Sequence, residues 1–324
     1  MAIPDPVDYI GANADWDKFS RMVSDNTGQH YLKMWLLNIK KNEERVKKHG
    51  WATEILQDAH FGKTAVLIGG SPSVATQLDT LRELQDDPGF ILIGITSNLK
   101  FLLTNGIRPR YVMIADAEPA MVRFWKDVDM DQTKDIVLIT SICTLPEMLD
   151  MWCGPMYFLA IYSGLKKIDK TMHRLYNPVN GCGALFHALC SQYNTGTAFA
   201  YNVFQTKILI FVGNELGFKD KDSPYYPDRK DYKDNWIRKP HMDIYGGVYY
   251  SNYMLMSLKL SLEDYLGKIC GDGWFFNCTE AGIFGVSARH NGHLPWIKQL
   301  TLKAGLMQAR MIMQTGQPFY LKGA

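Results

Sequence analysis

The stretch best suited to binding chemistry is Gly-Gly-Ser-Pro-Ser at residues 69–73, directly after the apolar residues 65–68. The four apolar residues predict a buried strand. Glycines permit backbone angles that other residues avoid, and Ser71 or Ser73 can cap a following helix that has Pro72 in its first turn. A strand that leads through a glycine turn into a helix N-terminus presents N–H groups to an anion, which predicts a phosphate site. An ordinary β–turn–α connection has the same pattern, because the stretch is neither a G-x-G-x-x-G fingerprint nor a P-loop.

Polar residues follow the other predicted strands in the same way. Ligands of open α/β sheets bind outside the carboxyl ends of the strands, where hydroxyl, amide and carboxylate groups suit a ligand with phosphate and sugar groups. Any one of these residues could simply cap a helix, so the prediction rests on the collection. Besides residues 69–73 it comprises Thr96-Ser97-Asn98, Asp116-Ala117-Glu118, Thr140-Ser141, Gly213-Asn214-Glu215 and Asn277-Cys278-Thr279-Glu280.

Asp116 and Glu118 are the carboxylates that could hold a divalent cation such as Mg²⁺, bridging the phosphates of a ligand. Alternatively, Asp116 hydrogen-bonds a ribose or caps the next helix. The sequence contains no H-E-x-x-H, no G-x-S-x-G and no Cys/His arrangement typical of a nucleophile.

The histidines divide into two groups by their surroundings. Those in irregular polar segments, His241, His290 and His293, are better candidates for acid–base chemistry than His187, which lies in an apolar helical pattern.

A regular alternation of strands and helices positions these residues. Each unit consists of a strand, a short turn and a helix, which predicts an α/β fold with a mostly parallel sheet covered on both faces. The predicted strands are 64–69, 90–94, 111–115, 135–140, 155–161, 207–213 and, as the last one, 274–277; the predicted helices are 15–49, 74–86, 97–104, one from Pro146, 164–175, 184–192, one from 194, 251–268 and 295–315.

Three segments organise the chain. A helical extension (1–62) precedes an α/β domain (63–290), and a C-terminal helix (291–324) packs on the same domain. Residues 217–247 show no periodicity and predict a long loop, which in a compact domain is typical of a functional segment.

Composition narrows the class of protein. The chain has 324 residues, 47% hydrophobic and 21% charged, as in soluble globular proteins. A net charge of +2 argues against a general nucleic-acid or membrane-surface binder, and the apolar runs are too short to span a membrane. Six cysteines without a C-x-x-C pair predict buried free thiols in a reducing compartment. With no leader pattern, we expect a cytoplasmic protein; a homo-oligomer is compatible with these features.

Four stretches resemble the motifs of one family, in the same order. Residues 66–73 look like its hydrophobic-G-x-G-P-S-L motif, 104–116 like L-x-x-x-G-I-x-P-D-x-x-x-x-x-D, 194–218 like S-V-G-T-A…L-V-G-x-D-L-A-F, and 277–285 like N-A-T-E-G-G-A-x-I-x-G. This is the 6-hydroxymethylpterin diphosphokinase MptE-like family. It contains archaeal pterin diphosphokinases and the motility-associated factor (Maf) glycosyltransferases, which put nonulosonic acids on flagellin serines and threonines.

The resemblance implies a Rossmann-like domain akin to the bacterial sialyltransferases that use a CMP-sugar donor. In the first motif, Ser71 stands where the family usually has Gly and Val74 where it has Leu. Two further departures bear on the site. Glu215 stands where members usually carry an Asp, so the contact of that residue cannot be transferred. Arg110 stands where an Asp usually follows the proline, so that position is not expected to be catalytic.

The resemblance leaves three functions open. The first is a glycosyltransferase that moves a CMP-activated nonulosonic acid to a hydroxyl of a protein Ser/Thr or of a glycan, with the 217–247 loop as a lid. The second is a pterin diphosphokinase with ATP and Mg²⁺ on Asp116 or Glu118, and the third is a nucleotide-binding module without catalysis. The expected nucleotide-binding residues are Gly69, Gly70, Ser71, Ser73, Ser97, Asn98, Thr195, Gly196, Thr197, Gly213, Asn214 and Glu215, and the expected substrate-binding residues are Asn277, Thr279 and Glu280.

The resemblance also implies a general base. In the related sialyltransferases the base is a histidine between the strand of the L-V-G-x-D-like motif and a long helix. Only His241 falls between Gly213 and the helix expected from Ser251. An imidazole with a pKa of about 6.5 can accept a proton from a hydroxyl at neutral pH. His241 and Asp116 are therefore the catalytic candidates, and an exposed loop histidine without a role is the alternative for His241.

Overall fold

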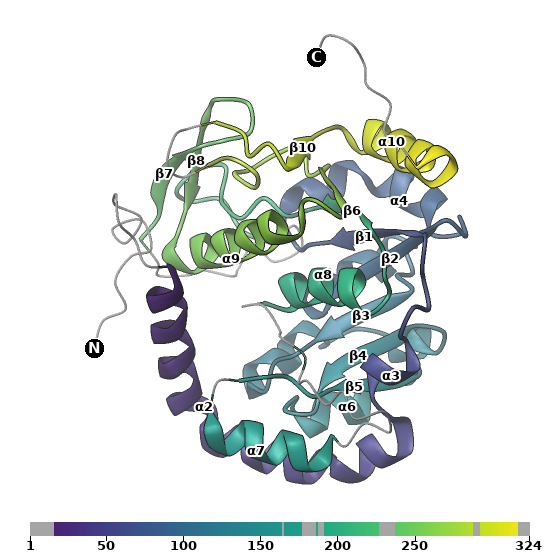
Figure 1. Ribbon diagram of the computed structural model, residues 1–324, viewed down its shortest axis with the longest axis vertical. Coiled ribbons are helices and arrows are strands. Elements are labelled where there is room, and N and C mark those ends of the chain that lie inside the picture. The colour runs from purple at the N-terminus through teal and green to yellow at the C-terminus, as the bar shows by residue number, and fades with distance from the viewer. Residues whose placement is uncertain are drawn as a thin grey trace.

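The computed structural model describes residues 16–163, 165–176, 186, 191–226, 237–287 and 292–316, with side chains from residue 31 onward. Its centre is an eight-stranded sheet in the order β10-β9-β6-β1-β2-β3-β4-β5, with parallel pairing between all neighbours (Figure 1). The predicted α/β fold is confirmed. The strands are β1 (Thr64–Ile68), β2 (Phe90–Ile95), β3 (Tyr111–Ile114), β4 (Val137–Ser141), β5 (Met156–Leu159), β6 (Ile208–Val212), β9 (Trp274–Asn277) and β10 (Ile297–Gln299).

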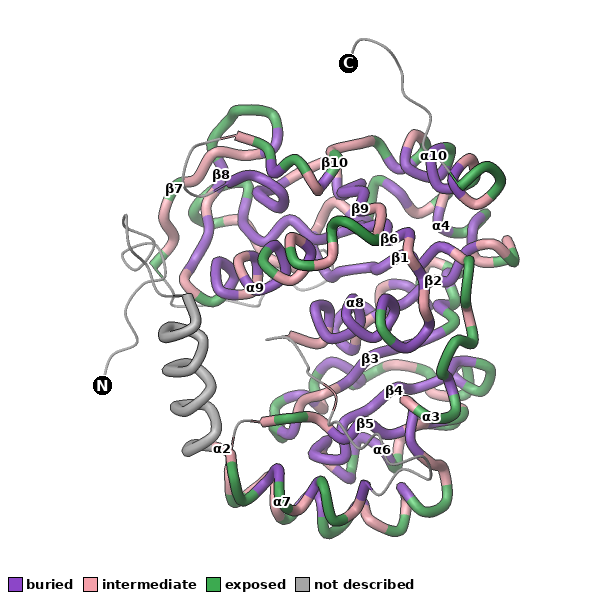
Figure 2. The backbone as a smooth tube through the Cα atoms, in the orientation of Figure 1, coloured by how far each residue is buried: buried purple, intermediate pink, exposed green. Residues whose placement is uncertain are grey.

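Each face of the sheet has its own core, because successive residues of a strand point to opposite faces. Ala65 and Leu67 pack on one face with helices α3, α8 and α9, whereas Val66 and Ile68 pack on the other with α4 and α10. Since helices cover both faces, the central strands are continuous apolar runs and are buried along their length (Figure 2). The α-helices are α2 (Trp16–His49), α3 (Ala52–Ile55), α4 (Leu78–Leu84), α5 (Leu99–Thr104), α6 (Pro146–Met151), α7 (Lys166–Leu175), α8 (Gln192–Asn202), α9 (Tyr253–Ile269) and α10 (Leu302–Thr315).

Helical additions flank the sheet domain at both ends, as expected. α2 packs against β5, α6 and α7, and α10 packs against β6. None of the helices in the described part of the chain combines the length and the hydropathy that a membrane span requires.

The C-terminal end of the sheet differs from the prediction. Residues 274–277 are not the last strand, because β10 follows and pairs with β9 from Ile297↔Phe275 to Gln299↔Asn277. The predicted helix 295–315 therefore begins only at Leu302, where the Thr301 side chain accepts the N–H of Ala304 as an N-cap. A strand of three residues is too short to produce a recognisable alternation pattern.

The predicted 217–247 loop is wrong in its second half. Lys239–Met242 form strand β7, which pairs antiparallel with β8 (Val248–Ser251). A lysine and a proline in β7 hide the strand pattern, and the edge position explains why Pro240 is tolerated there. The expected helix 74–86 is also divided, into a 3₁₀ turn (Pro72–Thr76) and α4. The expected helix 184–192 lies largely outside the described residues.

The cysteines differ in exposure. Cys143 and Cys278 are buried, but Cys153 and Cys270 are exposed, so the expectation that all six are buried is wrong for these two. Each of the two exposed cysteines follows the C-terminal end of a helix, Cys153 after α6 and Cys270 after α9. Burial raises the pKa of Cys143 to about 12, which keeps this thiol protonated. Cys182 and Cys190 lie outside the described residues.

A half-buried histidine makes stability depend on pH. His60 Nε2 lies 2.7 Å from the Tyr111 hydroxyl, at the amino end of β3. Burial, together with the nearby charges of Lys63 and Arg110, lowers the pKa of His60 to about 4. At pH values between this pKa and 6.5, the unfolded chain therefore binds a proton that the folded chain does not.

We accordingly expect the free energy of unfolding to fall as the pH drops from 6.5 towards 4. Replacing His60 with Gln should make this fall less steep, because it removes up to about one proton from the difference in proton binding between the unfolded and the folded chain. Urea unfolding across this pH range measures the slope, with His173→Gln on the exposed face of α7 as the control. Equal slopes in the parent and the His60 variant would contradict the assignment.

Candidate functional site

The strand order reverses between β1 and β6, and two predicted segments meet there. The chain adds β2 to β5 on one side of β1 and then returns to place β6 on the other. The N–H of Gly69 donates to Val212 O (2.8 Å) and that of Ser71 to Gly213 O (3.1 Å). A Cβ on Gly69 would come within 2.2 Å of Gly213 O, so only glycine allows this approach. Residues 69–73 and 213–215 thus form one unit at the switch point, where open α/β sheets bind ligands.

Glu215 ties this unit together. Its side chain is 3% exposed, and its Oε1 accepts the N–H of Ser73 at 2.6 Å. Its Oε2 accepts the hydroxyl of Tyr249 in β8, and its backbone carbonyl accepts the N–H of Ile283 at 2.9 Å. The sequence predicts that N–H groups of the glycine turn bind a phosphate. In the structure, one of them, the N–H of Ser73, donates to the protein's own Glu215 carboxylate. Contact between the turn and a nucleotide stays a prediction.

Aromatic side chains cover the glycine turn. A Cβ on Gly70 would meet the ring of Tyr226 at 3.1 Å and the hydroxyl of Ser97 at 3.3 Å. The ring of Tyr225 lies 5.1 Å from that of Tyr226, and burial raises the pKa of Tyr225. Neither tyrosine is among the site residues predicted from the sequence, although adjacent aromatic residues in a polar segment are a visible signal.

Asn98 joins the ends of β1 and β2. Its amide nitrogen donates to the carbonyls of Ile68 (2.7 Å) and Gly69 (2.8 Å), and its oxygen accepts the N–H of Ile95 at 3.0 Å. Asn98 therefore fixes the path of the chain into the glycine turn.

Residues 195–197 lie within α8 and are buried. A Cβ on Gly196 would come within 3.1 Å of Met113 Cγ, so this glycine lets the helix approach the sheet closely. The hydroxyl of Thr197 donates to Tyr193 O in the same helix at 3.0 Å. Packing accounts for these contacts, and a role of Thr195, Gly196 and Thr197 in binding a nucleotide stays a prediction.

Asp116 and Glu118 follow β3 at the same edge of the sheet. Asp116 Oδ1 accepts the N–H of Glu118 at 3.0 Å, and burial raises the pKa of Asp116. Both carboxylates lie near Tyr31 of α2, whose pKa is raised by burial and then by their charges. Within the described ranges no three His, Cys, Asp or Glu residues form a metal-binding group. Two carboxylates suit Mg²⁺ only with phosphates and water as further ligands.

The expected substrate-binding residues hold the end of β9 in place. Asn277 donates its amide to Phe284 O (3.0 Å) and Gln299 Oε1 (2.8 Å). Thr279 Oγ1 accepts the N–H of Asn214 at 3.1 Å. Glu280 Oε1 accepts the N–H of Leu302 at 2.9 Å, at the start of α10. These contacts are structural, and binding of substrate by the three residues stays a prediction.

A cavity of about 380 Å³ lies between the β7–β8 hairpin, α9 and residues 283–287. His241, the predicted base, lines this cavity together with Lys259 and Ser287, and the remaining lining residues are Pro240, Met242, Gly246, Gly247, Val248, Met256, Ile283 and Val286. Of the other histidine candidates, His293 donates its Nε2–H to the backbone carbonyl of Ile244 (2.9 Å), and His187 and His290 lie outside the described residues.

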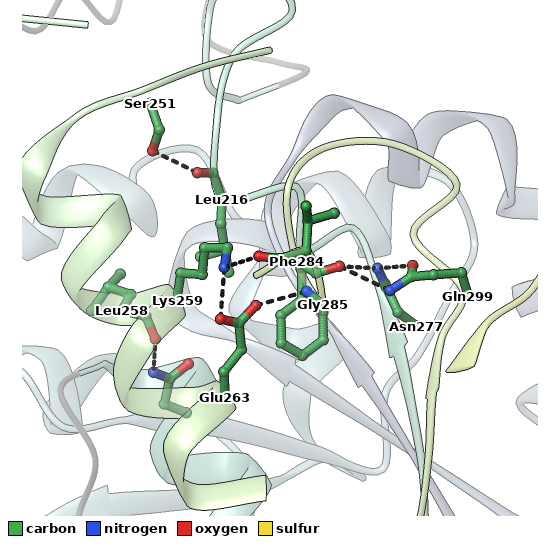
Figure 3. A network of polar contacts seen from close by, with 11 residues as sticks. Leu216, Ser251, Leu258, Lys259, Glu263, Asn277, Phe284, Gly285 and Gln299 are labelled. Atoms are coloured by element: carbon green, nitrogen blue, oxygen red, sulfur yellow. Dashed lines mark hydrogen bonds and ion pairs between the residues drawn. The ribbon is translucent and has the colours of Figure 1, made fainter. Parts of the chain in front are cut away.

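Lys259 and Glu263 form a buried ion pair at the wall of the cavity. Their side chains are 2% and 6% exposed, and Nζ lies 2.6 Å from Glu263 Oε2. Lys259 also donates to Val286 O (2.6 Å), and Glu263 Oε1 accepts the N–H of Gly285 (2.7 Å). Figure 3 shows both side chains reaching from α9 towards Gly285. Burial raises the pKa of Glu263. This pair is not among the predicted site residues, because a Lys and a Glu four residues apart usually lie on an exposed helix face.

The cavity adjoins the glycine turn through Glu215. His241 is paired directly opposite Tyr249, and Tyr249 donates to the Glu215 carboxylate that accepts the N–H of Ser73. Ile283, on the cavity wall, donates its N–H to the carbonyl of Glu215. The structure therefore brings the predicted base and the predicted phosphate turn to either side of one buried carboxylate.

Comparisons with known proteins agree with this architecture. A family model described as "6-hydroxymethylpterin diphosphokinase MptE-like" matches residues 34–221. Among solved structures, the chain is similar to the MAf glycosyltransferase from Magnetospirillum magneticum AMB-1, with 18% sequence identity and a TM-score of 0.59. The similarity covers 81% of this chain and 39% of that chain, so it shows a shared fold over well under half of that protein. No curated protein matches this chain.

Proposed function

Because the chain belongs to the MptE-like family, we propose that it is a nucleotide-dependent transferase, and more narrowly a glycosyltransferase. In this proposal it moves a nonulosonic acid from a CMP-activated donor to the hydroxyl of a protein or glycan acceptor. The observation that carries the proposal is the position of His241, which lines the cavity beside the β1/β6 switch point. The shared fold with a MAf glycosyltransferase supports it.

The proposed chemistry assigns the nucleotide to the switch point and the transferred sugar to the cavity, where the acceptor hydroxyl approaches His241. The acceptor oxygen attacks the anomeric carbon of the sugar while His241 takes the hydroxyl proton. The bond between that carbon and the phosphate oxygen breaks, and CMP leaves with the electron pair. Polar groups at the carboxyl edge would stabilise the charge on the departing phosphate.

A diphosphokinase is the second candidate, and the description of the family model favours it. Such an enzyme would transfer a diphosphate from ATP to a pterin hydroxyl. Asp116 and Glu118 would hold Mg²⁺ on the phosphates, and the Tyr225–Tyr226 pair offers aromatic rings against which a pterin can stack.

Nucleotide-induced stabilisation separates these candidates. We expect CMP without metal to raise the melting temperature of the parent, since a ligand at about 100 times its Kd stabilises a fold by about 2.7 kcal/mol. Gly70→Val should remove this shift, because its side chain would fill the space between the turn and Tyr226. Gly271→Val, at a glycine with no atom within 4 Å of a Cβ, is the matched control.

Each outcome selects one function. A response to ATP only with Mg²⁺ favours the diphosphokinase, and Asp116→Asn should then abolish the metal dependence. A response to CMP without turnover of any donor favours a binding module. If Gly70→Val is folded and binds CMP as the parent does, the nucleotide site lies elsewhere.

A further inference from the structure

We infer that the cavity between the β7–β8 hairpin and α9 binds a carboxylate-bearing sugar, with the carboxylate held by the ammonium group of Lys259. This inference rests on the proposed function, because it identifies the cavity as the place of the transferred sugar acid.

The size and lining of the cavity fit one sugar residue rather than a whole nucleotide. Its volume of about 380 Å³ is at the lower end of the range for ligand pockets, about 300–1,000 Å³. Apolar side chains such as Met242 and Met256 form much of the wall, with His241, Lys259 and Ser287 as its polar side chains. An apolar wall with a few polar groups is typical of a site that fixes the orientation of a small ligand.

Lys259 has hydrogen-bonding capacity left for a ligand. Its ammonium group carries three N–H donors. Among the described residues, Nζ has two acceptors, Glu263 Oε2 and Val286 O, both at 2.6 Å. These two partners fix Nζ at the wall of the cavity, so a ligand oxygen can accept the third N–H without rearrangement of the side chain.

The balance of charge favours a carboxylate over a phosphate. Glu263 already compensates the charge of Lys259, so a dianion would be repelled more strongly than a monoanion. Asp243, which follows Met242 of the cavity lining, accepts the N–H groups of Tyr245 (2.8 Å) and Gly247 (2.7 Å) within the hairpin turn. A single carboxylate that accepts one charge-assisted hydrogen bond therefore matches this site.

A purely structural role for Lys259 makes a different prediction. Removing one partner of a buried ion pair is strongly destabilising, whereas replacing both by apolar residues is often neutral or stabilising. The double variant Lys259→Met/Glu263→Met should therefore still fold, with a moderate loss of stability because Val286 O and the N–H of Gly285 lose these partners. If Lys259 only holds Val286 and α9 together, ligand binding should survive whenever the fold does.

The experiment measures binding of N-acetylneuraminic acid, and of its methyl ester as the uncharged match, by titration calorimetry on the full chain. We expect the parent to bind the acid, and the ester about tenfold more weakly, because the ester loses a charge-assisted hydrogen bond. We expect the folded double variant to bind the acid about tenfold more weakly than the parent and to keep the response to CMP.

The outcomes separate this inference from the proposed function. No binding of the acid by the parent, equal binding of acid and ester, or full binding by the double variant would each overturn the inference. Loss of any CMP response in the parent would overturn the proposed function instead, since the acid is tested without the nucleotide.

Discussion

Replacing His241 with glutamine should lower the proposed transfer rate by about 10²–10⁴-fold, the usual contribution of a general base. We expect the dissociation constant of the donor to stay nearly unchanged, because a base acts on the transition state and not on the bound donor. Glutamine keeps a polar side chain of similar length but cannot accept a proton at neutral pH. The loss should therefore appear in kcat.

This prediction depends on the position of His241 in the structure. His241 lies in β7, directly opposite Tyr249, and lines the cavity in which, in this proposal, the acceptor hydroxyl meets the sugar. A single-turnover rate and a donor dissociation constant, measured for the parent and for His241→Gln, test it. His173→Gln on the exposed face of α7 is the control. Full turnover in His241→Gln would remove the histidine from the mechanism and with it the main support for the glycosyltransferase.

Replacing Gly282 with alanine should lower the free energy of unfolding by about 2–5 kcal/mol. Gly282 has φ +82°, where a side chain costs about 1–2 kcal/mol. A Cβ would also lie 2.2 Å from Glu215 O and 2.4 Å from Glu215 Cα, and overpacking of this kind costs about 1–3 kcal/mol. Both contacts are with backbone, so relief requires Glu215 itself to move.

Gly62→Ala separates the two effects. Gly62 has φ +75° but no atom within 4 Å of its Cβ position, so the Gly62→Ala variant loses stability only through its strained backbone conformation. Urea unfolding of both variants gives the difference. The clash should also weaken CMP binding in Gly282→Ala, because Glu215 holds the N–H of Ser73. Equal decreases in the free energy of unfolding at the two positions would show that the backbone around Glu215 moves aside without loss of stability.

The strands were predictable because their physical signal is local. Runs such as 65–68 and 208–212 are apolar and end in turn residues, as expected of strands buried on both faces. The position of polar residues at the carboxyl edge followed from the same pattern. β7 and β10 were missed because they are short and lie at edges, where a proline or a lysine is tolerated.

The partners of the site residues could not be predicted, because they depend on long-range pairing. Nothing near Glu215 in the sequence indicates that its carboxylate meets Ser73 and Tyr249. Lys259 has the spacing of an exposed helix pair with Glu263, and only the packing of residues 284–287 against α9 buries it. His241 was found through a resemblance, whereas the cavity that it lines appears only in the structure.

Because β1 pairs with β6, the centre of the sheet can be completed only after residue 212 has been synthesised. β1 can pair with β2 soon after both leave the ribosome, but its other edge stays open until Ile208–Val212 has been made. An open edge in the middle of a future sheet is a site for wrong pairing. The glycine turn acquires Glu215 in the same step that closes this edge. A nascent chain stopped before residue 208 therefore carries both an aggregation-prone strand edge and an unfinished glycine turn. A ligand that binds only the finished turn, as proposed for a nucleotide, would selectively stabilise chains whose sheet is complete.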